Sequence, residues 1–383
     1  MKITIIGKGN AGVLTALHYY YHSQFSNQKV EIELIHDKKI PSLTVGQATT
    51  VELPFFLWTA LGTDFYNNQK ELKSTLKTGI LYEDWGKKNK EIFHCFSFGS
   101  YAIHYDTHRV QDYILKKGLF KVKIIDENII DYNKIDSDII FDCRGWPKNF
   151  TNYETLTNPL NAVICSNLNI KKSDLDIHWT RAVATPDGWC FYIPLHNTVS
   201  VGYMYNSKIT DKKSAEKNFK KMFNINHLRE EFPFKQYIAK NPIIDERIVL
   251  NGNMLFFLEP LESTSVATYI EWIRLTYDWL ILKRRTSIEI SNIIKNYTKQ
   301  IQNFILWHYN FGSKYNTPFW KYAKKLSNNI EKTDIEFKDI LNYSKDTDYS
   351  KIREIPFDRN NYRYAQWQPW SIKLWYDGVT KKM

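Results

Sequence analysis

Three glycines near the start of the chain have the spacing of a phosphate-binding turn. Gly7, Gly9 and Gly12 lie in the sequence G-K-G-N-A-G. In such a turn the first glycine permits a tight bend, the second lets the backbone approach a pyrophosphate, and the third lets a helix pack closely on a strand. The N–H groups at the start of that helix favour an anion. We therefore expect a dinucleotide to bind at Gly7, Gly9, Asn10, Ala11 and Gly12.

The segments around this turn have the patterns that such a site needs. Residues 2–6 are an apolar run, residues 13–21 have helical periodicity, and residues 30–35 alternate in period two, which predicts strand, turn, helix and strand. Asp37 lies 25 residues after Gly12, near where an acid would meet a ribose hydroxyl, although His36 could occupy that place instead. Residues 138–145 predict a return strand of the same sheet.

Composition narrows the class of protein. Of the 383 residues, 43% are hydrophobic and 24% charged, which is typical of a globular chain rather than a disordered one. Four cysteines without a C-x-x-C pair argue against a zinc knuckle or a disulfide scaffold. No apolar run approaches the roughly 18 residues of a membrane span. The apolar run near the start of the chain is too short for the hydrophobic region of a signal sequence. We expect a cytoplasmic α/β protein with no membrane association.

The net charge of +11 permits attraction to nucleic acid. Basic residues are interspersed with acids, and no recognition-helix or RNA-binding motif is present, so no nucleic-acid partner is predicted. Aromatic residues make up 15% of the chain and can fill a core or line a pocket for a flat substrate. His308, Trp367, Trp370 and Trp375 are candidates for either role. His104 and Asp106 lack a further ligand at suitable spacing, so no metal site is predicted.

Six stretches, in order, resemble the flavin-dependent tryptophan halogenases, and the chain looks like a compact member of that family. They are the glycine turn, V-G-Q-A-T at 45–49, L-K-T-G-I at 76–80 followed by Trp85, W-C-F-Y-I-P at 189–194, E-P-L-E-S-T at 259–264 and T-P-F-W at 317–320.

The resemblance implies an FAD-binding Rossmann-like fold of the flavin monooxygenase type, with a largely helical substrate-side region. Residues 1–285 are expected to form the FAD-binding and catalytic core, interleaved with substrate-side segments 51–120 and 150–240. Residues 286–383 are expected to be mainly helical and substrate-side. The implied cofactors are FAD, reduced by a separate flavin reductase, together with oxygen and a halide. Gly46, Gln47, Ala48 and Thr49 match the loop beside the flavin.

The same resemblance implies roles for four further residues. Lys77 matches the lysine that receives hypohalous acid beside a small electron-rich aromatic substrate, either as an ammonium that polarises the oxidant or as a neutral amine that forms a haloamine. Glu262 matches the carboxylate that stabilises the cationic ring and takes its proton. Thr264 and Ser265 match the halide site. The alternatives are a surface lysine at position 77 and ordinary helix-start residues at the other three positions. A homo-oligomer is compatible with the sequence.

Four departures from the family pattern are visible. Ser265 replaces a glycine, Phe191 replaces a tryptophan and Gln47 replaces a glutamate. Residues 251–258 lack the G-D-A element with which related flavin monooxygenases contact their cofactor. An FAD-dependent monooxygenase of the same fold that uses no halide is the alternative function.

Overall fold

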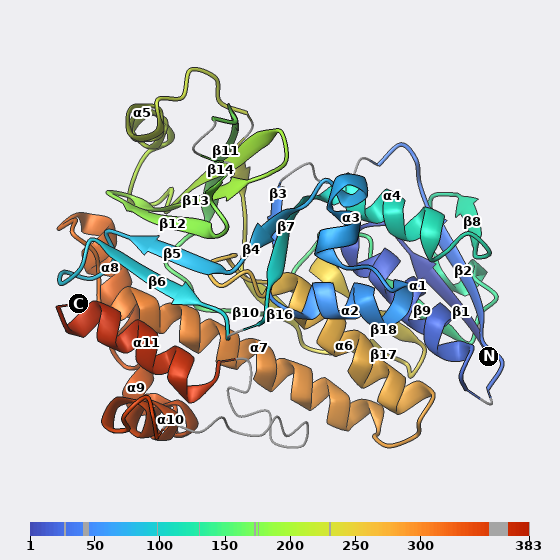
Figure 1. Ribbon diagram of the computed structural model, residues 1–383. Coiled ribbons are helices and arrows are strands. Elements are labelled where there is room, and N and C mark those ends of the chain that lie inside the picture. The colour runs from blue at the N-terminus through green and yellow to red at the C-terminus, as the bar shows by residue number, and fades with distance from the viewer. Residues whose placement is uncertain are drawn as a thin grey trace. The chain divides into compact units, whose positions relative to one another are not determined.

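The computed structural model describes residues 1–26, 28–40, 46–97, 99–129, 131–171, 174, 176–229, 231–351 and 367–382. The chain divides into two compact units, whose elements are labelled in Figure 1. Unit 1 comprises Met1–Thr75, Ala102–Thr155 and Tyr237–Lys295, and unit 2 comprises Leu76–Tyr101, Leu156–Gln236 and Asn296–Met383. The predicted boundary near residue 285 stays a prediction.

A six-stranded sheet in the order β17-β18-β9-β1-β2-β8 forms the centre of unit 1. All its pairings are parallel except that of β17 with β18. The central strands are rich in isoleucine and buried on both faces, as parallel strands usually are. The strands are β1 (Lys2–Ile6), β2 (Glu31–His36), β8 (Lys123–Asp126), β9 (Ile139–Asp142), β17 (Ile243–Ile244) and β18 (Ile248–Leu250).

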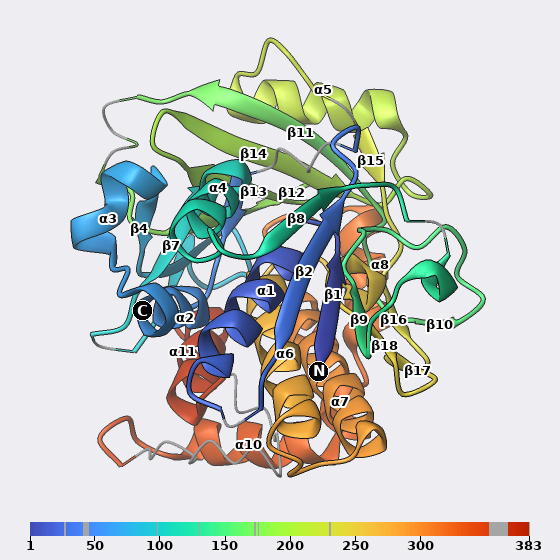
Figure 2. The same ribbon diagram turned by 90° about the vertical axis from the view of Figure 1, so that its right-hand side faces the viewer.

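Helix α1 (Asn10–Ser23) packs on β1 and β2, as Figure 2 shows. It also contacts α6 (Ser265–Leu280), where the hydroxyl of Tyr19 donates to Thr276 at 3.0 Å. Strand, glycine turn, helix and parallel strand therefore follow one another as the sequence predicts. The other helices of unit 1 are α2 (Glu52–Leu61), α3 (Phe65–Leu72) and α4 (Thr107–Lys117), with 3-10 turns η1 (Tyr132–Lys134) and η3 (Gly252–Met254).

Two small sets of strands complete unit 1. Strand β3 (Gly46–Ala48) pairs antiparallel with β7 (Ala102–Asp106). A three-stranded sheet has the order β10-β16-β19, formed by Tyr153–Thr155, Tyr237–Ala239 and Phe256–Phe257.

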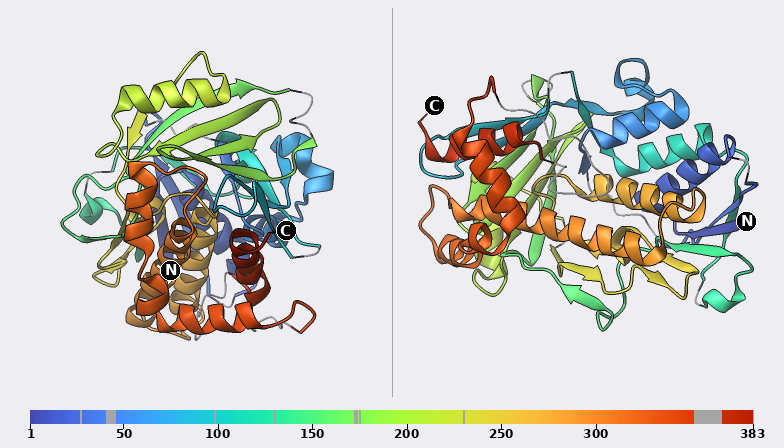
Figure 3. Two further views of the ribbon diagram at one scale, coloured as in Figure 1. Left: turned by 90° about the vertical axis from the view of Figure 1, so that its left-hand side faces the viewer. Right: turned by 90° about the horizontal axis from the view of Figure 1, so that it is seen from below.

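Unit 2 is built on a seven-stranded sheet in the order β15-β11-β14-β13-β12-β5-β6. Its pairings are antiparallel except that of β12 with β5. Helix α5 (Lys212–Phe223) buries Ala215 and Phe219 in a core with β11 and β14, and Figure 3 shows this helix lying across the green strands. The strands are β5 (Gly79–Glu83), β6 (Glu91–Cys95), β11 (Ala162–Asn169), β12 (Thr180–Thr185), β13 (Gly188–Pro194), β14 (Thr198–Tyr205) and β15 (Glu231–Pro233).

The last part of the chain is helical where the structure describes it. The unit boundary falls within α7, and α11 packs on α10 and on β6. Strand β4 (Thr75–Lys77) carries the chain from unit 1 into unit 2. No helix in the described ranges is both long and apolar enough to cross a membrane. The helices are α7 (Ser287–Asn310), α8 (Pro318–Ser327), α9 (Ile330–Thr333), α10 (Ile335–Asp346) and α11 (Pro369–Thr380).

Candidate active site

The glycine turn of unit 1 joins β1 to α1. Gly7 has a φ of +101°, and a β-carbon there would lie 2.6 Å from the carbonyl oxygen of Cys143, so only glycine fits. The N–H of Gly7 donates to the carbonyl oxygen of Ile35 at 2.7 Å, which ties the turn to β2. A β-carbon at Gly9 would meet nothing within 4 Å. The turn is therefore closed against the sheet at Gly7 and open at Gly9.

The N-terminus of α1 has the properties of an anion site. Gly9 is the N-cap and contributes no side-chain hydrogen bond, while Ala11 and Gly12 are buried. The amide of Asn10 is held in place, donating to Tyr105 Oη at 2.9 Å and accepting from Gln111 Nε2 at 3.2 Å. The first N–H groups of a helix have no intrahelical acceptors and carry the positive end of the helix dipole. The open cradle and this uncapped end fit the pyrophosphate of a dinucleotide such as FAD.

Asp37, the predicted ribose contact, follows the last residue of β2. Its Oδ1 accepts a hydrogen bond from the N–H of Lys39 at 2.8 Å, and its carbonyl oxygen accepts one from the N–H of Ile40 at 3.1 Å. The carboxylate therefore closes the turn after β2.

The loop predicted to lie beside the flavin is fixed within unit 1. Gly46, Gln47 and Ala48 form β3, with Gln47 opposite Tyr105 of β7. The buried Thr49 exchanges hydrogen bonds with the backbone of Ile103, and its hydroxyl lies 3.1 Å from the Ile103 carbonyl oxygen. Thr49 thus anchors the loop through protein contacts. Val45, the first residue of the matched stretch, lies outside the described residues.

Sequence reasoning missed a second turn at the start of α1. Gly252 has a φ of +63°, and a β-carbon there would lie 2.8 Å from the β-carbon of Ala11. The neighbouring Asn251 donates to the hydroxyl of Thr15 at 3.1 Å, and Asn253 accepts from the hydroxyl of Tyr269 at 3.0 Å. The available signal is the N-G-N triplet, whose glycine suits a positive φ. This segment, which lacks the G-D-A element, therefore borders the α1 turn.

Asp142, at the end of β9, has a structural environment. It is fully buried and accepts hydrogen bonds from Arg144 Nε at 2.9 Å and from the hydroxyl of Tyr132 at 2.6 Å. Burial and the neighbouring carboxylate raise the pKa of Tyr132, so its phenol stays protonated as a donor.

The segment before α6 carries the predicted halide residues and Glu262. Glu262 is buried, and Ser263 adopts a φ of +58°, which is uncommon for a residue with a side chain. Thr264 is the N-cap of α6 but makes no side-chain capping bond. It is 1% exposed, and its Oγ1 has no hydrogen-bond partner among the described residues. Ser265 begins the helix.

A buried hydroxyl without a partner costs about 1–3 kcal/mol unless a water molecule or a ligand supplies the hydrogen bond. The side chain of Thr264 does not cap α6, since it accepts no hydrogen bond from the backbone of the helix. An uncapped helix start beside an unpartnered hydroxyl can hold a small anion.

Lys77 is the last residue of β4 and belongs to unit 2. Its side chain is 0% exposed, so it is not the solvated surface lysine that was the alternative. Its Nζ lies 5.4 Å from the centre of the Phe96 ring. The next residue, Thr78, bonds to the carbonyl oxygen of His178 through both its N–H and its hydroxyl. A β-carbon at Gly79 would lie 2.5 Å from the carbonyl oxygen of His94. The K-T-G triplet thus places the lysine through close backbone packing.

Strand β13 contains Trp189 and Phe191, which are both buried. A β-carbon at Gly202 of β14 would lie 2.1 Å from the Phe191 ring, so the ring covers the glycine directly. The T-P-F-W stretch starts α8: Thr317 is its N-cap, and the indole N–H of Trp320 donates to the carbonyl oxygen of Thr185 at 2.8 Å. That last stretch therefore has a structural role in unit 2.

Aromatic side chains of unit 2 gather around His308. Nδ1 of His308 lies 2.7 Å from the carbonyl oxygen of Phe304, and its ring centre lies 4.3 Å from that of Trp375. Trp367 stacks on Phe304 at 4.0 Å. The indole nitrogen of Trp375 has no hydrogen-bond partner in the part of the chain that the structure describes. Trp370 is partly exposed.

His104 and Asp106, considered for a metal, have structural partners in unit 1. Nδ1 of His104 lies 3.1 Å from the hydroxyl of Thr75. Asp106 caps α4 by accepting a hydrogen bond from the N–H of His108 at 3.0 Å.

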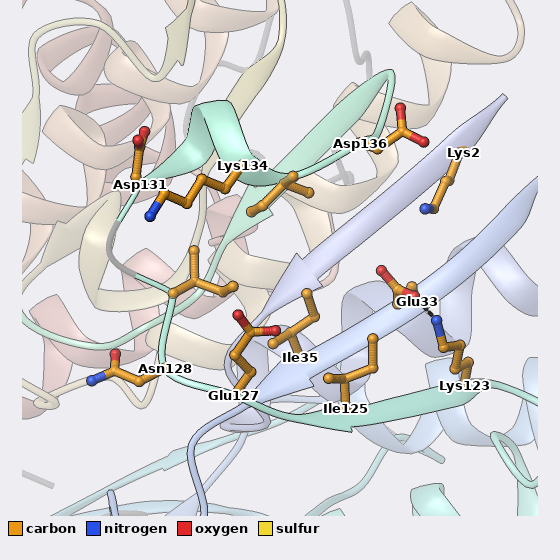
Figure 4. Close-up of a pocket in the computed structure, with 12 residues that line it drawn as sticks. Lys2, Glu33, Ile35, Lys123, Ile125, Glu127, Asn128, Asp131, Lys134 and Asp136 are labelled. Atoms are coloured by element: carbon orange, nitrogen blue, oxygen red, sulfur yellow. Dashed lines mark hydrogen bonds and ion pairs between the residues drawn. The ribbon is translucent and has the colours of Figure 1, made fainter.

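Figure 4 shows a separate cavity of about 340 Å³ on the sheet of unit 1. Its floor includes Ile35 and Ile125, and its wall includes the Lys123–Glu33 ion pair, with 2.6 Å between Nζ and Oε1. None of the residues predicted for catalysis or for nucleotide binding lines this cavity.

Comparison with known proteins places the chain in a family. The tryptophan halogenase family model matches residues 2–133 and 128–364. Tryptophan 7-halogenase RebH of Lentzea aerocolonigenes is 21% identical, over 85% of this chain and 79% of that protein.

Solved structures of tryptophan halogenases have the same fold as this chain. Tryptophan 6-halogenase SttH of Streptomyces toxytricini superimposes with a TM-score of 0.81 at 16% identity, covering 99% of this chain and 90% of that one. MibH, a tryptophan 5-halogenase, superimposes with a TM-score of 0.82 at 18% identity, covering 99% and 86%. These matches confirm the predicted FAD-binding Rossmann-like α/β fold with its helical region. The chain belongs to the tryptophan halogenase family of flavin-dependent enzymes.

Proposed function

We propose that this enzyme uses reduced FAD, oxygen and a halide to halogenate a small electron-rich aromatic substrate. The observation that carries the proposal is the buried hydroxyl of Thr264 at the uncapped start of α6, which has no hydrogen-bond partner among the residues that the structure describes. A monooxygenase that uses no halide has no need of such a group. Halide use is the property that separates the two functions.

FAD is held by the glycine turn and by the N-terminus of α1, whose cradle is open at Gly9. When bound in its reduced form, FAD would supply two of the four electrons that reduce oxygen, and the halide would supply the other two as it becomes hypohalous acid. The sequence has one dinucleotide fingerprint, so the reducing equivalents come from a separate flavin reductase.

The halide is held by the hydroxyl of Thr264 and by N–H groups of the first turn of α6. A hydroxyl and helix N–H groups are all donors, and the helix dipole adds positive potential. Ser265 contributes a side chain where the family pattern has glycine, and its size restricts the space beside the anion.

Lys77 positions and polarises the hypohalous acid. Its ammonium donates a hydrogen bond to the oxygen of that acid. A ring carbon of the substrate then attacks the halogen, the oxygen–halogen bond breaks, and the released hydroxide takes a proton from the Lys77 ammonium and leaves as water. Burial strengthens this hydrogen bond, because water does not screen the charge of a fully buried lysine.

Glu262 acts on the second half of the substitution. Attack on the halogen leaves a cationic ring that still carries a proton on the halogenated carbon. A carboxylate stabilises that positive charge and takes the proton, which restores the aromatic ring. The burial of Glu262 supports this role because the charge is then little screened.

Trp189 and Phe191 keep the organic substrate away from the flavin. Both are buried on β13, and their ring centres lie 6.3 Å apart. Aromatic rings exclude water and substrate without adding a reactive group. This supports halogenation in preference to direct hydroxylation.

The test supplies the full chain with FAD, a flavin reductase, NADH and oxygen, together with a panel of phenols, anilines and indoles. Reactions are run with chloride, with bromide and without halide, and products are read by mass spectrometry. We expect halogenated arenes only when halide is present, and about 10²–10³-fold less product from Lys77→Met. Hydroxylated products that form regardless of halide would instead identify a monooxygenase.

A further inference from the structure

The end of β2 lies at the nucleotide turn and determines how the ribose is recognised. The N–H of Gly7 bonds to the carbonyl oxygen of Ile35, so His36 is the first residue beyond the contact between strand and turn. In folds of this type an acid near the end of the second strand accepts a hydrogen bond from the ribose. In this chain three side chains lie near that position: Asp37, Asp126 and His36.

Two carboxylates lie near the end of β2, and both are engaged in protein contacts. Asp37 accepts from the N–H of Lys39 at 2.8 Å. Asp126 of β8, opposite His36 in the sheet, accepts from the N–H of Lys38 at 3.0 Å and lies 3.3 Å from Lys38 Nζ. Both carboxylates therefore already hold the backbone of the turn after β2.

The imidazole of His36 has a different environment. The residue is 8% exposed, and its Nδ1 has no hydrogen-bond partner among the described residues. A polar atom that is buried without a partner is costly, so a ligand hydroxyl that supplies the bond is favoured. Burial and the positive charge of Lys8 lower the pKa of His36 by more than Asp126 and a backbone hydrogen bond at Asp37 raise it, so the ring is neutral at pH 7 and has both a donor and an acceptor nitrogen.

We propose that His36, rather than Asp37, hydrogen-bonds a hydroxyl of the adenosine ribose and so selects the ribonucleotide end of the cofactor. A hydroxyl both donates and accepts hydrogen bonds, so it can pair with Nδ1 whether that nitrogen carries a proton or a lone pair. The inference rests on the proposed use of FAD. It makes His36 a specificity residue for the cofactor of the halogenation reaction.

The experiment measures nucleotide affinity and needs no catalysis. The full chain, freed of flavin, is titrated with FAD, and ADP, 2′-deoxy-ADP and 3′-deoxy-ADP are then used as competitors. We expect at least one deoxy nucleotide to bind about five- to tenfold more weakly than ADP, as loss of one hydrogen bond implies.

Three variants assign that preference to a side chain. His36→Ala should bind ADP and both deoxy nucleotides with equal affinity, while His36→Gln, which keeps a donor and an acceptor, should restore part of the preference. Asp37→Asn is the matched control next in sequence and should keep the preference of the unmodified chain. A purely structural role for His36 would lower all affinities together and leave their ratio unchanged.

The outcomes separate this inference from the proposed function. A preference that survives His36→Ala, or one that disappears in Asp37→Asn alone, overturns the assignment to His36. Equal binding of ADP and both deoxy nucleotides by the unmodified chain overturns it as well. Failure of the unmodified chain to bind FAD at all would contradict the proposed function itself.

Discussion

A β-carbon on residue 12 would lie 1.8 Å from the carbonyl oxygen of Gly7. The first turn of α1 therefore packs on the glycine turn with no space between them. Only glycine at position 12 permits this approach, although its backbone is helical and needs no special φ. The glycine turn depends on this pair of residues for its shape.

Gly12→Ala should therefore weaken FAD binding by about ten- to a hundredfold, because relieving the overlap costs about 1–3 kcal/mol in a closely packed turn. Gly9→Ala is the matched control for protein stability, since its β-carbon enters open space. We expect the thermal midpoint of Gly9→Ala to be unchanged. FAD titration and thermal unfolding of both variants would check this, and a Gly12→Ala protein that binds FAD normally would contradict it.

Thr264→Val should improve stability while impairing halide use. The substitution keeps the side-chain shape but removes a buried hydroxyl that has no partner among the described residues, so stability should rise by about 1 kcal/mol. Loss of a donor to an anion should raise the KM for halide about tenfold or more. Urea unfolding and the halide dependence of product formation measure the two effects. A lower stability with an unchanged KM for halide would argue for a purely structural threonine.

Lys77→Met replaces a fully buried ammonium with an apolar side chain of similar length. Halogenation should fall by about 10²–10³-fold, as for loss of one preorganised donor. FAD affinity should not change, because no residue predicted to hold the nucleotide is altered. Lys77→Arg serves as a charge control and should also be inactive, since a planar guanidinium does not fit the space of an ammonium.

Glu262→Gln should slow halogenation by about 10²–10⁴-fold, the range for a general base. The amide keeps the size of the side chain but cannot take the ring proton. Formation of hypohalous acid, followed with a small trap such as monochlorodimedone in the absence of substrate, should continue. Loss of that signal would instead assign Glu262 to the oxidant-forming step.

Asp142→Asn should destabilise unit 1 without a catalytic defect of its own. The substitution removes the buried charge that pairs with Arg144 at 2.9 Å. We expect the free energy of unfolding to fall by about 2–4 kcal/mol. This is less than the full cost of breaking a buried ion pair, because Arg144 is partly exposed. Asp131→Asn, at the N-cap of η1, is the control and should change stability by less than about 0.5 kcal/mol. Urea denaturation of both variants compares them.

Local patterns in the sequence were sufficient for the nucleotide-binding elements. The strand at Lys2–Ile6, the turn, α1 and the strand at Glu31–His36 are continuous in sequence, and each has its own periodicity or glycine signal. The same holds for β9, whose apolar run is bounded by a polar turn. The structure confirms these elements, and their binding of a nucleotide stays a prediction.

Features formed by distant segments were not predictable in the same way. The burial of Lys77 has no local signature, because lysine is ordinarily exposed and the packing depends on His178 and His94. The contact of Gly252 with Ala11 joins residues 241 positions apart. The catalytic roles of Lys77 and Glu262, and the halide role of Thr264 and Ser265, stay predictions from the family resemblance.

The interleaved course of the chain limits how the protein can be recombined with its relatives. Each unit is assembled from three separate stretches, so the backbone passes between the units at five peptide junctions. A chimera that exchanges one whole unit must therefore be joined at all five places, and a single crossover would leave at least one of the two hydrophobic cores built from mismatched parents. Proteolytic excision cannot release either unit as one continuous polypeptide.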